Sequence, residues 1–198
     1  MQHLLTFFSI ILRAFTGQPT LDRRSTEQIY APPMAEVIPP PVLPVAECRA
    51  EPYEQCLDIA LDYVGVREFP GDKHNPVVLR WLQGVVASVR DDETAWCSAF
   101  ANAVCEYLGL SRSGTLVARD WMLIGTEVDE PQRGDVVVFW RGTPDGWQGH
   151  VAFFIRREGD LIHCLGGNQS NRVSIAAYPA HRWLGYRRLH PVSDSLAA

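Results

Sequence analysis

The spacing of apolar residues divides the chain into a helical part followed by a part with the period of strands. Apolar side chains recur at the spacing of one helix face in residues 53–66, up to Gly65. Residues 76–85 predict a second helix, with proline in its first turn. A third helix is expected from residue 97 to about residue 108, where Gly109 is a natural stop.

Strand periodicity begins at Asp135. Five short segments are rich in β-branched and aromatic residues and are separated by Gly, Asn or Asp: 135–140, 150–157, 160–165, 172–178 and 184–189. Helices followed by a run of adjacent strands predict an α+β domain, with the N-terminal helices packed on an antiparallel β-sheet.

A proline-rich stretch separates the predicted domain from the N-terminus. Residues 31–45 hold six prolines without helical or strand periodicity, which is typical of an extended spacer. At 198 residues the chain can close one ordinary core. We therefore expect an apolar N-terminal segment, a linker, one folded domain and a tail, at residues 1–30, 31–47, 48–190 and 191–198.

The apolar run from Leu4 to Leu12 is too short to span a bilayer, which takes a helix of about 20 residues. It has the length of a signal-peptide core but lacks a preceding Lys or Arg and a clear cleavage site. Three interpretations stay open: a poor export signal, a membrane-surface anchor with weak association through residues 4–15, or an artefact of start-site choice.

Composition narrows the classes of partner and site. The net charge of −5 and the pI near 5.6 argue against a nucleic-acid binder, which usually has a basic excess. The five cysteines are an odd number, so at least one is free or pairs with another chain. Their spacing matches no common zinc pattern, so we expect no structural metal.

Cys97, in the segment AWCSAF, is the first candidate for chemistry. It lies at a predicted helix start after Asp92, Glu93 and Thr94, residue types that favour a helix N-terminus. The helix dipole and the unpaired backbone N–H groups there favour the thiolate, which is the nucleophilic form. The alternative is a small buried cysteine that only packs.

His150 opens a predicted strand after a glycine-rich loop and could act as the base for this thiol. A third group should accept a hydrogen bond from the far nitrogen of the imidazole. We favour Asn168, whose backbone can approach closely because it follows two glycines. The alternative third group is His163, in the predicted strand 160–165 just before Asn168. Asn168 could also simply form a turn, which is a common role for asparagine.

Five blocks in this order resemble the NlpC/P60 and CHAP superfamily of cysteine peptidoglycan hydrolases, in its small bacterial and phage-associated branch. The blocks are AWCSAF, PQRGDVVVFW, GHVAFF, LGGNQSNRVSI and LGYRR, and the resemblance covers roughly residues 53–189. It implies a papain-like core, and it implies that residues 48–190 form a cysteine peptidase or amidase domain.

The resemblance implies Cys97 as nucleophile and His150 as base. The third residue falls on Asn168 by the CHAP pattern and near His163 by the NlpC pattern. Many CHAP members carry an acid two residues before the asparagine, but this chain has Gly166 there. Asp135 matches a recurrent family position, where we expect a structural role in the turn.

The implied reaction is acyl transfer by a thiolate, which needs no metal or organic cofactor. Trp96, Trp121 and the loop that contains Glu68 are candidates for the substrate groove. The alternative is that the tryptophans belong to the core and the loop is only a connection.

The implied substrate is the stem peptide of bacterial peptidoglycan, cut by an amidase or an endopeptidase. A toxin amidase and an acyltransferase are alternatives on the same core, and a catalytically silent wall-binding or phage structural module is an alternative of another class. We expect a monomer in the cell envelope, periplasmic, secreted or phage-delivered.

Overall fold

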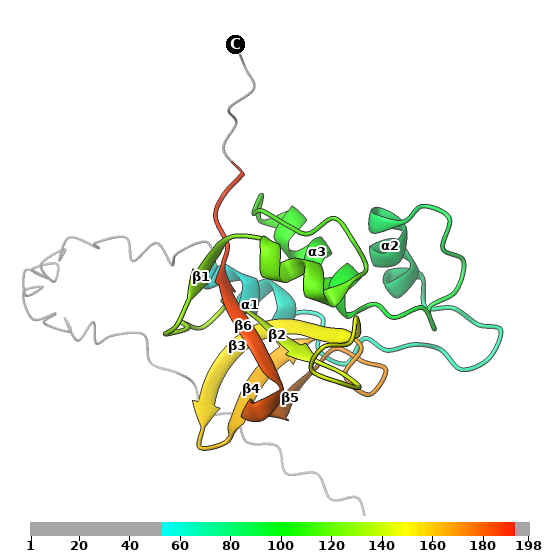
Figure 1. The fold of residues 1–198 in the computed structure, drawn as a ribbon. Helices are drawn as coiled ribbons and strands as arrows, with labels where there is room; N and C mark the ends of the chain where they lie inside the picture. Colours follow the sequence, from blue (N-terminus) through cyan, green and yellow to red (C-terminus); the bar gives the residue numbers. More distant parts are fainter. Residues whose placement is uncertain (1–52, 193–198) are drawn as a thin grey trace, which may run out of the picture. The chain divides into compact units, whose positions relative to one another are not determined.

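The structure is a computed structural model that describes residues 53–192. The predicted N-terminal segment, the linker and most of the tail lie outside the described residues. The described chain has the predicted α+β architecture, with a six-stranded antiparallel sheet and a few helices (Figure 1). The helices are α1 (Gln55–Leu61), α2 (Pro76–Val85) and α3 (Cys97–Tyr107), with 3-10 helices η1 (Ala118–Leu123) and η2 (Ala180–Arg182).

The second and third helices have nearly the predicted bounds, but the first is shorter. After Leu61 the backbone tightens, since the N–H groups of Tyr63 and Val64 bond to carbonyls three residues back. Gly65 then has φ +95°, a left-handed conformation that ends the turn. The predicted helix 53–66 therefore combines α1 with a turn.

The sheet has the strand order β1-β6-β2-β3-β4-β5, and every neighbouring pair is antiparallel. Five of its strands correspond to the five predicted segments, and β1 is additional. The strands are β1 (Thr126–Val128), β2 (Val136–Trp140), β3 (Gly149–Glu158), β4 (Leu161–Gly166), β5 (Ser174–Pro179) and β6 (Trp183–Arg188).

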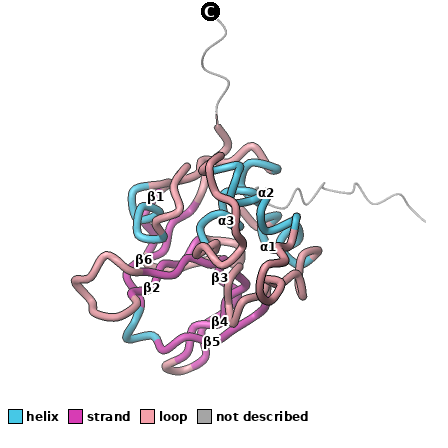
Figure 2. The backbone as a smooth tube through the Cα atoms, turned by 90° about the vertical axis from the view of Figure 1, so that its right-hand side faces the viewer, coloured by secondary structure: helices cyan, strands magenta, loops and turns pink. Residues whose placement is uncertain are grey.

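The sheet curls, so that β4 and β5 face β2 and β6 across the inner side of the curl (Figure 2). The ring of Tyr178 on β5 stacks on Phe139 of β2 with centroids 4.8 Å apart, although β3 and β4 separate these strands in the sheet. Apolar side chains from alternate positions of the strands, such as Val137 and Ala152, form a cluster with Phe139. The curl therefore creates an enclosed inner side.

The other set of alternate positions packs against the helices. Val136, Val138 and Phe153 share one core cluster with α3, which is buried along most of its length. The start of α3 is thereby fixed against β3, the strand that carries His150.

Asp135 ties the turn before β2 to the end of β6. Its buried carboxylate accepts hydrogen bonds from Arg188 at 3.0 and 2.8 Å and from the backbone N–H of Gln132 at 2.7 Å. These contacts are of the structural kind expected for this residue.

Candidate functional site

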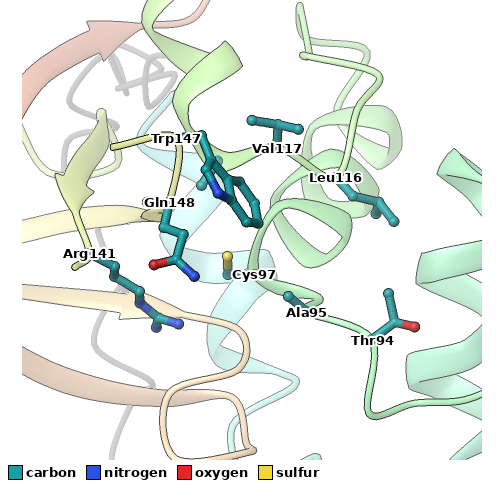
Figure 3. Close-up of a pocket in the computed structure, with 10 residues that line it drawn as sticks. Thr94, Ala95, Cys97, Leu116, Val117, Arg141, Trp147 and Gln148 are labelled. Carbon is teal, nitrogen blue, oxygen red and sulfur yellow. The ribbon is translucent and has the colours of Figure 1, made fainter. Parts of the chain in front are cut away.

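Cys97 is the first residue of α3 and is 4% exposed. In Figure 3 its sulfur faces a cavity, with Trp147 and Gln148 beside it and Arg141 further along the wall. The cavity has a volume of about 300 Å³. Its lining consists of Thr94, Ala95, Cys97, Leu116, Val117, Ala118, Arg141, Trp147, Gln148 and Gly149.

Burial raises the pKa of the Cys97 thiol above its ordinary value. Hydrogen bonding by the backbone N–H groups of Val151 and Ser98 and the charge of Arg141 act in the opposite direction, but they are the smaller effects. The helix start thus favours the thiolate as predicted, yet desolvation outweighs it. In this structure the group is a neutral thiol at pH 7.

The acidic residues before α3 do not cap it. The cap position is Trp96, which makes no side-chain capping hydrogen bond. Asp92 is instead buried and accepts hydrogen bonds from the backbone N–H groups of Phe69 and Asn75, at 3.0 and 2.8 Å. It holds the loop before α2 in place.

His150, the second residue of β3, is fully buried on the inner side of the curled sheet. Its ring lies 4.9 Å from that of Tyr178 and 6.5 Å from that of Phe139, measured between centroids. Burial, together with the nearby charge of Arg141, lowers the pKa of His150 to about 3. The imidazole is therefore neutral at pH 7.

The two hydrogen bonds of His150 define its tautomer. Nδ1 lies 3.0 Å from Nη2 of Arg141, and Nε2 lies 3.2 Å from Oε1 of Gln169. A guanidinium can only donate, so Nδ1 must be the acceptor and Nε2 must carry the proton. Nε2–H then donates to Gln169. The lone pair of the neutral ring is at Nδ1, and it accepts the hydrogen bond from Arg141.

The structure brings Cys97 and His150 to adjacent positions without a hydrogen bond between their side chains. The Cys97 thiol lies at the backbone N–H of Val151, the residue after His150. Among the hydrogen bonds of residues 53–192, none joins this thiol to the His150 ring. Arg141 contacts His150 and also lines the Cys97 cavity, so it links the two groups.

Gln169, which sequence reasoning missed, takes the position beside His150 that was expected of Asn168. Its side-chain N–H donates to the carbonyl of Ser174, which turns its Oε1 towards the imidazole. Asn168 has φ +54° and forms the turn, a conformation that asparagine tolerates. The Gly-Gly-Asn turn followed by a second amide residue was the available signal.

His163, the other candidate, is not in contact with His150. Its Nε2 lies 3.3 Å from the carboxylate of Glu158, although without hydrogen-bond geometry. On β4 its neighbours Ile162 and Cys164 belong to the inner cluster, so His163 has the alternate orientation.

Trp96 and Trp121, the two tryptophans considered for the substrate groove, are both fully buried. Nε1 of Trp96 donates to Glu68 at 2.7 Å, and Nε1 of Trp121 donates to Ser98 at 2.8 Å. Both rings are core elements in this structure. The aromatic side chain that lines the cavity is Trp147, which is 76% exposed.

Residues 53–192 contain neither a metal-binding cluster nor a membrane-spanning helix. No cluster of three or more His, Cys, Asp or Glu side chains could hold a metal ion. No helix of this part of the chain has both the length and the apolar character to cross a membrane. The four cysteines of the described chain, Cys56, Cys97, Cys105 and Cys164, are free thiols.

Comparison with known protein families gives a match to part of the chain. The Amidase_5 family, described as bacteriophage peptidoglycan hydrolase, matches residues 98–185. The match covers less than half of the chain, contains His150 and Gln169, and begins one residue after Cys97. It supports a peptidoglycan hydrolase of the phage type, an enzyme that degrades the cell wall. A search of curated proteins found no match.

Proposed function

We propose that this protein is a cysteine peptidoglycan hydrolase with a papain-like core of the NlpC/P60 or CHAP kind, and that it cleaves an amide bond of the stem peptide. The observation that carries the proposal is the combination of a cysteine at a helix start, open to a cavity, with a hydrogen-bonded histidine on the adjacent strand. The phage hydrolase match supports the substrate class.

In the proposed reaction, Cys97 Sγ attacks the amide carbonyl while its proton passes to Nδ1 of His150. The imidazolium then donates this proton to the leaving nitrogen as the C–N bond breaks, which leaves a thioester on Cys97. Water attacks the thioester and gives its proton to Nδ1. Collapse of the second intermediate releases the carboxylic acid and regenerates the thiol.

Gln169 holds the imidazole in the tautomer that this reaction needs. Its Oε1 accepts from Nε2–H, which leaves the Nδ1 lone pair on the side of Arg141 and the cavity. We therefore assign Gln169, rather than Asn168 or His163, as the third residue. It positions the base without exchanging protons, as a carboxamide can.

The start of α3 would stabilise the negative charge of the tetrahedral intermediate. The backbone N–H of Cys97 is the candidate oxyanion donor, because the first N–H groups of a helix have no intrahelical partner. The exposed indole of Trp147 provides an apolar wall for the peptide in the cavity. We infer that the enzyme acts as a monomer on peptidoglycan in the cell envelope, reached by export or phage delivery.

The test is to incubate the full chain with purified peptidoglycan and to measure new amino groups and new reducing sugars separately. Amide hydrolysis predicts amino groups without reducing ends, and mass spectrometry of the fragments then identifies the bond. Reducing ends alone would instead show glycan cleavage. Co-sedimentation with the wall but no fragments, over several wall types, would favour the silent binding module.

A further inference from the structure

Arg141 has an unusual position for an arginine beside a proposed catalytic base. It follows β2 directly, lines the cavity with Cys97, and places Nη2 at 3.0 Å from Nδ1 of His150. Its positive charge also acts on the Tyr178 hydroxyl, whose pKa it lowers against the effect of burial. Within residues 53–192, none of the ion pairs involves Arg141. Its charge thus has no carboxylate partner there.

This contact occupies the one atom of His150 that the reaction requires. A neutral imidazole has a single acceptor nitrogen, and Nε2–H is already used by Gln169. The proton of Cys97 and the guanidinium of Arg141 therefore compete for the same lone pair. In the described structure Arg141 donates to this lone pair, and no hydrogen bond joins the Cys97 thiol to the His150 ring.

A carboxylate is the ligand that would draw Arg141 away. A guanidinium binds a carboxylate through two parallel charge-assisted hydrogen bonds, which are stronger than its bond to a neutral imidazole. Arg141 is only half-buried and borders the cavity, so a ligand there can reach it. Stem peptides of peptidoglycan carry free carboxylates close to their amide bonds.

We propose that Arg141 determines specificity by binding a carboxylate of the substrate peptide, and that this binding withdraws it from Nδ1 of His150 and frees the base for Cys97. The proposal rests on the hydrolase function proposed above. It predicts that the enzyme cleaves stem peptides with the recognised carboxylate free and discriminates against the same peptides with that group amidated.

The experiment compares kcat/KM for three synthetic muramoyl stem peptides. One has both carboxyl groups free, one has the α-carboxyl of D-glutamate as a primary amide, and one has the C-terminal carboxyl as an amide. The variants of the full chain are Arg141→Gln and, as a matched control, Arg119→Gln. Arg119 follows Ala118, which lines the cavity, but its own side chain donates to the backbone carbonyls of Thr143, Pro144 and Gln148.

For the wild type, one of the two amidations is expected to lower kcat/KM by about 10- to 100-fold, the range for loss of a hydrogen bond to a charged group. Arg141→Gln should cleave all three peptides at similar rates, whereas Arg119→Gln should keep the wild-type ratio. Equal ratios in the wild type and Arg141→Gln would overturn the proposal and leave the hydrolase function intact.

A second measurement follows the base without turnover. In Cys97→Ala, the ¹⁵N resonance of His150 Nδ1 should shift towards that of a non-hydrogen-bonded nitrogen when the peptide with both carboxyl groups free binds. The peptide in which the recognised carboxyl group is amidated should not cause this shift. An identical response to both peptides would contradict the proposal. If the wild type hydrolyses no wall peptide and none binds Cys97→Ala, both the proposed function and this inference fail.

Discussion

At the scale of residues, burial keeps both members of the proposed pair neutral. It raises the pKa of the Cys97 thiol and lowers the pKa of the His150 imidazole to about 3. A thiolate–imidazolium pair would have two desolvated charges at this site, which is costly without full compensation. We therefore expect the proton to move from Cys97 to His150 only when substrate is bound.

The first prediction concerns alkylation of Cys97 by iodoacetamide in the absence of substrate. Because the reactive form is the thiolate and the pKa of Cys97 is raised, the rate should be slow at pH 7 and increase by about tenfold per pH unit up to pH 9. The Cys97→Ala variant corrects for the other thiols. A fast rate that is constant between pH 5 and 8 would instead indicate a preformed ion pair.

The second prediction concerns the group that orients His150. Gln169→Ala should lower kcat by about 100-fold, within the range that a positioned base contributes, because the imidazole loses its acceptor at Nε2. Gln169→Glu keeps an acceptor and should retain more activity. Its negative charge favours the imidazolium, so the acid limb of its pH profile should move to higher pH.

Asn168→Ala is the matched control for this prediction. Asn168 forms the turn and makes no hydrogen bond to His150 in the described chain, so the loss of activity should be much smaller than for Gln169→Ala. If Asn168→Ala lost more activity than Gln169→Ala, Asn168 would be the third residue instead of Gln169.

Residue types at the site could be predicted from the sequence, but their pairing could not. Cys97 and His150 stand out because each lies at the start of a predicted element. Gln169 and Arg141 do not, since each is adjacent to a turn and has no pattern of its own. Their roles depend on which side chain meets His150 when the sheet curls, and no local signal carries that information.

At the scale of elements, the loop between β4 and β5 is held against the start of α3 by close packing. A Cβ atom at Gly167 would lie 2.6 Å from Cβ of Phe100 and 2.7 Å from the ring of Trp96. Both neighbours are buried, so neither can move away freely. This contact fixes the loop that carries Gln169.

The third prediction follows from this packing. Gly167→Ala should lower the free energy of unfolding by about 1–3 kcal/mol through overpacking and should also lower kcat, because the loop moves Gln169 from His150. Denaturant unfolding and turnover on the same samples measure both effects. A stable Gly167→Ala protein with wild-type kcat would show that the loop is not positioned in this way.

Gly84→Ala provides the control for a glycine substitution elsewhere. Gly84 lies in α2, and a Cβ there meets no atom within 4 Å. Alanine favours the helix, so this variant should be more stable by about 0.5–1 kcal/mol and equally active.

Elements with a clear period were predictable, while short ones were not. Helix α2 and strands β2 to β6 have strong apolar patterns, and their observed bounds lie within two residues of the predicted ones. Strand β1 has three residues, none of them buried, and it forms only because β6 offers an open edge. Its existence depends on the tertiary structure.

At the scale of the whole molecule, the neutral buried His150 links stability to pH. Its pKa is about 3 in the folded protein and near 6.5 in the unfolded chain, so the unfolded state binds more protons between these values. The contribution of His150 therefore makes the folded state less stable as the pH falls from about 6.5 towards 3.

The fourth prediction is a comparison of unfolding free energies between pH 7 and pH 4 for the wild type and His150→Gln. Below about pH 6.5, the unfolding free energy of the wild type should fall more steeply than that of His150→Gln, by up to about 1.4 kcal/mol per pH unit. The reason is that only the wild type must keep a buried imidazole at this position neutral. Carboxylates titrate in both proteins and cancel in the difference. Parallel curves would mean that His150 is accessible to protons in the folded state.

The central claim is that Cys97 is the nucleophile of a wall-degrading enzyme, and the most direct test is the rate of muropeptide release by the full chain and two variants. Cys97→Ala should release none while keeping its fold. Cys105→Ala, which removes a buried thiol further along the same helix, should remain active. Release of the same fragments by Cys97→Ala at the wild-type rate would contradict the account.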